Sequence, residues 1–240
     1  MTTAELVVAA VAVAVGACAQ GSFGFGLGLV AAPVLALTDD RLVPGPLLMV
    51  ALVLTGLVAL RERGGLDWRG IRWAIVGRIP GSILGAVAVV TLPERGLVIV
   101  FAVLVLAGVG LSVAGWDVEP TRTTLFSAGA ASGLMGSITS IGGPPMALVY
   151  QRRSGPELRS TLALFFLFGS ALSIGLLVLA GEIGRNDVGR AAWLLPPMLV
   201  GYLASRIVSS HLDRGRTRTA ILVFSAVSSV ALLVLELTGH

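Results

Sequence analysis

Two stretches decide the fold of this chain: Gly21-Ser22-Phe23-Gly24-Phe25-Gly26-Leu27-Gly28 and Gly136-Ser137-Ile138-Thr139-Ser140-Ile141-Gly142-Gly143-Pro144-Pro145. Each interrupts a long apolar run, and the two occupy matching places in the two halves of the chain. Backbone that is not helical is tolerated at membrane depth only where it lines a cavity or is buried in protein. The pair of interruptions therefore predicts a pair of broken helices that share one binding site.

The composition is typical of a protein that lies within a membrane. Hydrophobic residues make up 55% of the 240 residues, charged residues make up 12%, and the mean hydropathy is +0.93. A soluble domain usually carries about 25% charged residues. We therefore expect an all-α polytopic protein whose main partner is the lipid bilayer. Its apolar runs cover residues 6–37, 43–60, 71–92, 97–114, 124–150, 162–180, 191–208 and 220–237.

An internal repeat relates the two halves. Gly26 and Gly142 are separated by 116 positions, as are Pro80 and Pro196, and Gly85 and Gly201. A constant offset across three spaced features predicts duplication of one four-segment unit, with repeats over residues 1–115 and 116–240. The alternative is chance agreement among residue types that are common in membranes.

The arginines bear on whether the interrupted segments cross the bilayer. If all eight apolar runs cross, seven loop arginines lie on one face and nine on the other. If both interrupted segments are re-entrant hairpins, the division is twelve to four, which is the bias expected of a cytoplasmic face. We therefore favour re-entrant segments, inverted halves and termini outside, within a range of six to eight crossings.

Several functions are disfavoured by what the sequence lacks. The formal charge of +4 comes from arginines in short loops, which indicates membrane orientation rather than nucleic-acid binding. Cys18 is the single cysteine, and neither histidine lies in an apolar run, so we expect no metal site, no cofactor and no enzymatic activity. The apolar runs carry no interior carboxylate, which argues against transport of cations or amines.

The chemistry of the interruptions favours an anion. Glycine lets a ligand approach the backbone closely, and proline fits the first turn of a helix, so half-helices should start near Gly28 and at Pro144. Helix N-termini inside a membrane carry a partial positive charge of about +0.5, which attracts anions. The alternative is that the glycines and hydroxyls serve helix packing. The candidate substrate-binding residues are Gln20, Ser22, Gly24, Gly26, Gly28, Arg78, Ser137, Thr139, Ser140, Gly142, Gly143 and Pro144.

Arg78 is the one basic residue within a crossing. Two interpretations are open. Its side chain could be the counter-charge of a bound anion, or it could extend along the helix to the cytoplasmic interface.

The second glycine-rich stretch, together with the repeat and the loop Arg61-Glu62-Arg63-Gly64-Gly65-Leu66-Asp67-Trp68, resembles the sulfite exporter TauE/SafE family of membrane permeases. The likeness covers almost the whole chain. It implies export of sulfite or small organosulfonates such as sulfoacetate across a bacterial inner membrane. The first stretch departs from the family, because its glycines alternate as Gly24-Phe25-Gly26-Leu27-Gly28 where consecutive glycines are common.

Three functions follow from these observations. The leading hypothesis is a transporter of a small anion that works by alternating access between the two repeats. The alternatives are an anion channel and a membrane scaffold or biogenesis factor that transports nothing. The oligomeric state is open, and a homo-oligomer is one alternative.

Overall fold

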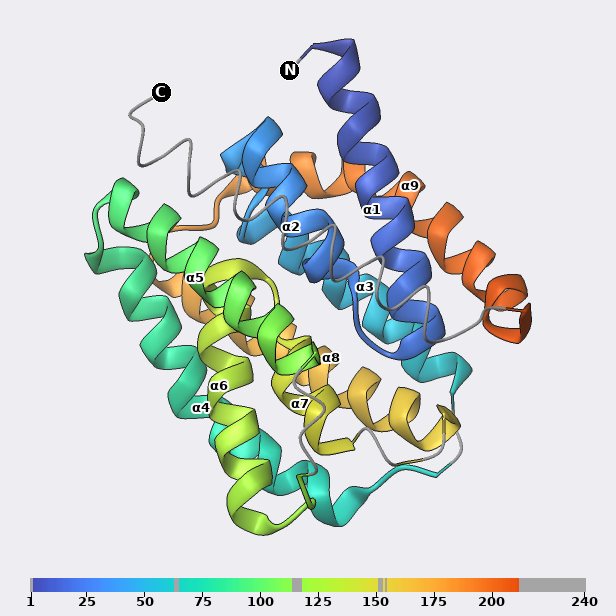
Figure 1. Cartoon of the computed structure of the whole chain (residues 1–240). Coiled ribbons are helices and arrows are strands. Elements are labelled where there is room, and N and C mark those ends of the chain that lie inside the picture. Colours follow the sequence, from blue (N-terminus) through green and yellow to red (C-terminus); the bar gives the residue numbers. More distant parts are fainter. Residues whose placement is uncertain (1, 63–64, 114–117, 151–152, 154, 212–240) are drawn as a thin grey trace.

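The apolar runs form helices that pack into a bundle (Figure 1). The computed structural model describes residues 2–62, 65–113, 118–150, 153 and 155–211, and within these ranges all regular structure is helical. The helices are α1 (Thr3–Phe23), α2 (Leu27–Thr38), the 3₁₀ turn η1 (Asp40–Leu42), α3 (Gly45–Arg61), α4 (Trp68–Thr91), α5 (Glu94–Val113), α6 (Arg122–Thr139), α7 (Gly143–Tyr150), α8 (Gly155–Leu179) and α9 (Arg185–His211). The last apolar run, 220–237, lies outside the described residues.

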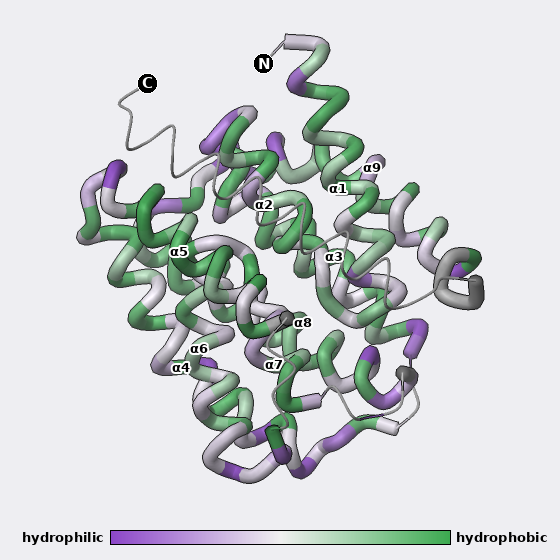
Figure 2. Tube along the Cα trace, viewed as in Figure 1, coloured by the Kyte–Doolittle hydropathy of each residue, from purple (hydrophilic) through white to green (hydrophobic). Residues whose placement is uncertain are grey.

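Four of these segments are long and apolar enough to cross a membrane: Thr3–Phe23, Asp40–Arg61, Trp68–Thr91 and Pro156–Leu179. Two shorter apolar helices, Leu27–Thr38 and Arg95–Leu111, accompany them. Figure 2 shows hydrophobic residues along the helices and hydrophilic residues gathered at turns and helix ends. The polytopic all-α prediction is confirmed, while the number of crossings stays a prediction.

The first interruption separates α1 from α2. Gly24 adopts a left-handed conformation with φ 88°, and its N–H donates to the carbonyl of Gln20 at 2.8 Å, which ends α1. Gly26 also has a positive φ of 137°, and α2 starts at the next residue. Side chains other than glycine rarely adopt these angles, so the glycines fix the position of the break. Because α2 packs back along α1, the break lies at the turn of a helical hairpin (Figure 1).

The second interruption repeats this geometry. Ser140 takes the left-handed conformation with φ 59°, and its N–H donates to the carbonyl of Gly136 at 3.0 Å, which ends α6. The helix α7 then starts at Gly143, followed by two prolines at positions that need no N–H donor. The ends of α1 and α6 are 116 positions apart, and so are the starts of α2 and α7.

The helices pack in corresponding pairs. The helix α4 lies against α6, and α9 lies against α1. Gly81 approaches the backbone of Ala130, and Gly201 approaches the backbone of Ala14, so closely that an added Cβ would be within 3.0 Å of the partner Cα. The two alanines are again 116 positions apart. Such backbone contacts through glycine are how membrane helices associate without a hydrophobic driving force.

Candidate functional site

The two interruptions meet inside the bundle. Gly28, in the first turn of α2, packs against Ser140 and Ile141 of the second interruption. Gly143, at the start of α7, packs against Phe25 of the first, where an added Cβ would lie 2.9 Å from the Cβ of Phe25. The starts of α2 and α7 are therefore adjacent, as the sequence predicts for broken helices that share one site.

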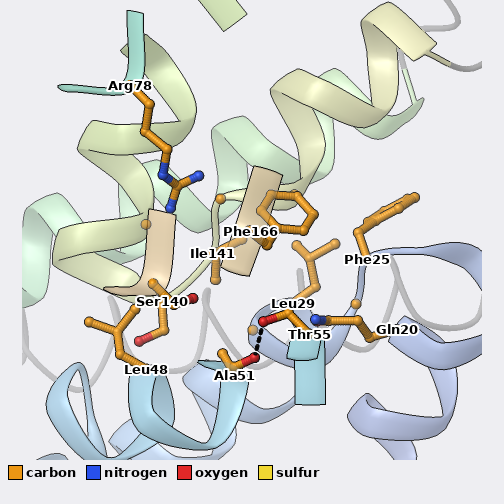
Figure 3. A pocket seen from close by; sticks show the side chains of 16 residues that line it. Gln20, Phe25, Leu29, Leu48, Ala51, Thr55, Arg78, Ser140, Ile141 and Phe166 are labelled. Carbon is orange, nitrogen blue, oxygen red and sulfur yellow. Dashed lines mark hydrogen bonds between the residues drawn. The ribbon is translucent and has the colours of Figure 1, made fainter. Parts of the chain in front are cut away.

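Arg78 extends from α4 toward this junction (Figure 3). Arg78 is 2% exposed and enclosed by other helices, so the interpretation that it reaches the interface is wrong. Its Nη1 donates to the hydroxyl of Ser132 at 2.8 Å, and that hydroxyl donates to the carbonyl of Gly142 at 2.6 Å. The guanidinium also lies 4.7 Å from the ring centroid of Phe165 and 5.9 Å from that of Phe166. Arg78 is thus held by a hydroxyl and by aromatic faces, and its Nε has no hydrogen-bond partner among the described residues.

Three glycines make room for the guanidinium. A Cβ at Gly136 would lie 3.0 Å from Nη2 of Arg78, and a Cβ at Gly142 would lie 3.2 Å from Nη1. A Cβ at Gly169 of α8 would overlap the guanidinium itself. The buried position of Arg78 therefore depends on glycine in three separate segments.

A pocket of about 420 Å³, including its open part, lies at this junction (Figure 3). Arg78 is the ionisable side chain among the described residues that line it, and most of the others are apolar or glycine. In the described part of the chain, no group of three metal-ligating side chains occurs. The lining consists of Gln20, Phe25, Gly26, Gly28, Leu29, Leu48, Ala51, Thr55, Arg78, Gly136, Ser140, Ile141, Gly142, Gly143, Phe166 and Ser170.

Seven of the twelve candidates from the sequence lie in this lining: Gln20, Gly26, Gly28, Arg78, Ser140, Gly142 and Gly143. The five others, Ser22, Gly24, Ser137, Thr139 and Pro144, lie outside it.

Those five have other surroundings. Ser137 shares a hydrogen bond of 2.8 Å with Ser173, and Thr139 donates to the carbonyl of Met135 at 2.7 Å within its own helix. Thr139 thus matches the packing interpretation. Ser22 is buried near the end of α1, Gly24 packs on α8, and Pro144 lies near Gly108 of α5.

Sequence reasoning missed two lining hydroxyls, those of Thr55 and Ser170. Each is a polar residue inside an apolar run, which was the available signal. Phe25 and Phe166, which supply aromatic walls, carried no signal that separated them from ordinary apolar residues.

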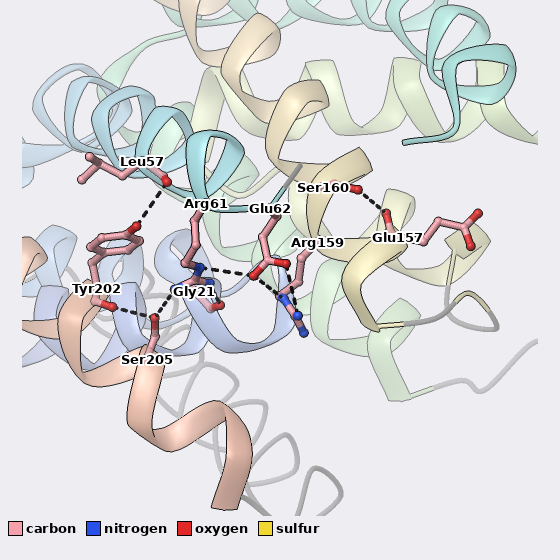
Figure 4. A network of polar contacts seen from close by, with 9 residues as sticks. All are labelled: Gly21, Leu57, Arg61, Glu62, Glu157, Arg159, Ser160, Tyr202 and Ser205. Carbon is pink, nitrogen blue, oxygen red and sulfur yellow. Dashed lines mark hydrogen bonds and ion pairs between the residues drawn. The ribbon is translucent and has the colours of Figure 1, made fainter. Parts of the chain in front are cut away.

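A polar network ties the two halves together beside the pocket (Figure 4). Glu62, just after α3, accepts hydrogen bonds from Arg159 of α8 at 3.0 and 3.3 Å and from Arg61 at 3.2 Å. Arg61 also donates to the carbonyl of Gly21 and, at 3.0 Å, to the hydroxyl of Ser205 in α9. The side chains of Arg61, Glu62 and Arg159 are only 15–16% exposed. This network joins the end of α1, next to Gln20, to both α8 and α9.

Comparison with known families agrees with this architecture. The family model described as sulfite exporter TauE/SafE matches residues 8–232. The chain belongs to the sulfite exporter TauE/SafE family. The resemblance expected from the second glycine-rich stretch is thereby confirmed, and the chain is a membrane transporter of this family.

Two TauE/SafE relatives are similar over most of their length. The probable inner membrane transporter protein TsaS of Comamonas testosteroni is 27% identical over 231 residues, which cover 90% of this chain and 93% of TsaS. The probable sulfite/organosulfonate exporter TauE of Cupriavidus necator is 24% identical over 195 residues, or 76% of each chain. The expected multi-pass location in a bacterial inner membrane agrees with the name of TsaS and with the four candidate spans. No solved structure matches this chain significantly.

Proposed function

We propose that this TauE/SafE protein exports a small anion, sulfite or a short organosulfonate, which binds in the pocket between the two interruptions. The observation that carries the proposal is Arg78, a buried arginine in the pocket lining with no carboxylate among the described residues of that lining. Leaving a cation unpaired in a buried environment is costly, and an anionic ligand would remove that cost. We therefore assign to Arg78 the role of binding the negatively charged group of the substrate.

The starts of α2 and α7 support the same assignment. Both helices begin at the pocket, at Leu27 and Gly143, and their positive ends add to the field of Arg78. Planar guanidinium groups suit oxyanions because they donate two parallel hydrogen bonds. Among the described lining residues, none offers a negative charge that would repel the ligand.

The apolar walls favour a substrate with a small organic part. Phe25, Leu29, Leu48 and Phe166 face the pocket, while the charge is confined to Arg78. Small-molecule sites are commonly apolar with a few polar groups that fix the orientation. A sulfonate with a short carbon chain would place its charged group at Arg78 and its carbon chain against the apolar walls. Sulfite would contact only the polar side of the pocket. The relative from Cupriavidus necator carries both substrates in its name.

For the transport cycle we propose alternating access between an N-terminal repeat, 1–115, and a C-terminal repeat, 116–240, inverted relative to each other. The 116-residue offset between the ends of α1 and α6 and between the starts of α2 and α7 supports the duplication. The hairpin of α1 and α2 supports a re-entrant element. Movement of one repeat against the other would expose the pocket to each side in turn.

The test is a binding screen followed by a flux measurement. Purified protein is heated with sulfite, thiosulfate, sulfoacetate, isethionate or acetate, and a sulfur oxyanion or sulfonate should raise the unfolding temperature most. Efflux of the best ligand from loaded vesicles should saturate. Flux far above roughly 10³ per second without saturation would indicate a channel, because a transporter completes a conformational change in each cycle. Absence of both stabilisation and flux would favour a scaffold.

A further inference from the structure

Gln20 lies in the last turn of α1, just before the first interruption, and bonds to residues on both sides of the break. Its main-chain carbonyl accepts the N–H of Gly24 at 2.8 Å, and its side-chain Oε1 accepts the N–H of Leu27 at 3.2 Å. Gln20 is 7% exposed and lines the pocket. One residue thus closes the end of α1 and caps the start of α2.

The contact with Leu27 fixes which way the Gln20 amide faces. A backbone N–H is a donor only, so the amide atom that meets it must be the oxygen. The amide nitrogen, with its two N–H groups, is then the atom left for the pocket, and Figure 3 shows it directed toward Thr55 and away from its own helix. Gln20 therefore offers the pocket donors and not acceptors.

Neighbouring hydroxyls do not duplicate this donor. Thr55 already donates its proton to the carbonyl of Ala51 at 2.7 Å, and Ser140 donates to the carbonyl of Pro44 at 3.1 Å. Each hydroxyl has one proton, so these two face the pocket as acceptors. Among the described lining residues, the uncharged side-chain donors left are the amide of Gln20 and the hydroxyl of Ser170.

We propose that Gln20 is a specificity-determining residue whose amide nitrogen donates a hydrogen bond to the bound anion. This proposal rests on the proposed function. It assigns to the pocket an uncharged donor from α1, Gln20, in addition to the cation from α4, Arg78. It also predicts weaker binding of substrates that carry an ammonium group near this amide. An ammonium N–H and an amide N–H are both donors, so they cannot form a hydrogen bond with each other.

The substitution Gln20→Glu separates the two roles of this side chain. A glutamate oxygen accepts the N–H of Leu27 as the amide oxygen does, so the cap on α2 is kept. The second oxygen replaces the amide nitrogen and puts a negative charge where the donor was. The probe is methanesulfonate, which remains a monoanion between pH 4 and 8. At pH 8 we expect its affinity to fall by about tenfold to a hundredfold, the effect of losing one hydrogen bond to a charged group.

Acid should restore binding in Gln20→Glu, since a protonated carboxyl is again a donor. Apart from the new carboxyl, Arg78 is the ionisable side chain among the described lining residues. The matched control is Gln20→Met, which loses both the cap and the donor. It should unfold at a lower temperature than Gln20→Glu and should bind methanesulfonate weakly at every pH.

Two results would overturn the proposal. One is Gln20→Glu binding methanesulfonate within twofold of the wild-type affinity at pH 8, which would show that the amide nitrogen does not contact the anion. The other is a Gln20→Glu variant that binds methanesulfonate as weakly as Gln20→Met does at every pH from 4 to 8. That result would assign Gln20 a structural role. Failure of the proposed function looks different, because the wild-type protein would then bind none of the sulfur oxyanions or sulfonates.

Discussion

Gly28 of α2 lies directly against Ser140 of the second interruption. A Cβ added to Gly28 would approach the carbonyl carbon of Ser140 to 2.9 Å and the Cα of Ile141 to 3.1 Å. These residues are 112 positions apart in the chain, yet both line the same pocket. The start of α2 therefore packs against the non-helical residues between α6 and α7. One added methyl group at Gly28 is enough to test this contact.

We expect Gly28→Ala to lower the free energy of unfolding by about 1–3 kcal/mol, because the added methyl group overpacks a backbone contact. Ligand stabilisation should weaken as well, since Ser140 and Ile141 would shift. Thermal unfolding in detergent, with and without sulfonate, measures both effects. The control is Gly175→Ala in α8, where a Cβ would meet no atom of the described chain within 4 Å. Equal behaviour of the two variants would contradict the close contact between the interruptions.

The hydroxyls near the second interruption should differ in their effect on binding. Ser132 holds both Arg78 and the carbonyl of Gly142, so Ser132→Ala should weaken anion affinity by about tenfold. Ser137 pairs with Ser173 outside the pocket lining, so Ser137→Ala should leave affinity unchanged. Titration calorimetry with a sulfonate compares the two variants. A larger loss in Ser137→Ala would mean that the site lies elsewhere.

The network around Glu62 should stabilise the contact between the two halves. Replacing Glu62 by glutamine leaves Arg61 and Arg159 close together without the carboxylate between them. We expect the protein to be destabilised by about 1.5–3 kcal/mol, the range for hydrogen bonds to charged groups. Arg122→Gln is a suitable control, because Arg122 stacks on Trp73 away from this network. If both variants unfold at the wild-type temperature, the network contributes nothing to stability.

Both topologies considered for the interrupted segments place the two ends of α3 on opposite sides, and the re-entrant one, with its termini outside, places Asp40 outside. In a Cys18→Ser background, cysteine replaces the exposed residue Asp40 before α3 or the exposed residue Arg69 after it. An impermeant maleimide added outside intact cells should label Asp40→Cys but not Arg69→Cys. Labelling of both from the same side would overturn the assignment of α3 as a crossing.

The sequence predicted the broken helices because glycine leaves a local signal. The half-helix expected near Gly28 runs from Leu27 to Thr38, and the one expected at Pro144 begins at Gly143. Both follow from residues that either permit left-handed backbone or require no N–H donor. The all-helical membrane architecture followed from composition in the same way.

The environment of side chains could not be predicted, because it depends on partners far along the chain. Arg78 lies about a turn and a half beyond Arg72, and its inward position depends on room left by the glycines at 136, 142 and 169 and on its contact with Ser132. Likewise, the sequence made both Ser137 and Ser140 candidate binding residues, although only Ser140 of the two lines the pocket. Which hydroxyl faces the ligand depends on helix rotation, which glycine patterns do not encode.

The central claim is that the buried guanidinium of Arg78 binds the transported anion. Arg78→Met keeps an unbranched side chain in the same space without the charge, and Gly169 still accommodates it. Efflux of labelled sulfite or sulfonate from loaded vesicles, at equal amounts of folded protein, should fall more than about thirtyfold in this variant. Efflux at the wild-type rate, with unchanged saturation, would contradict the account.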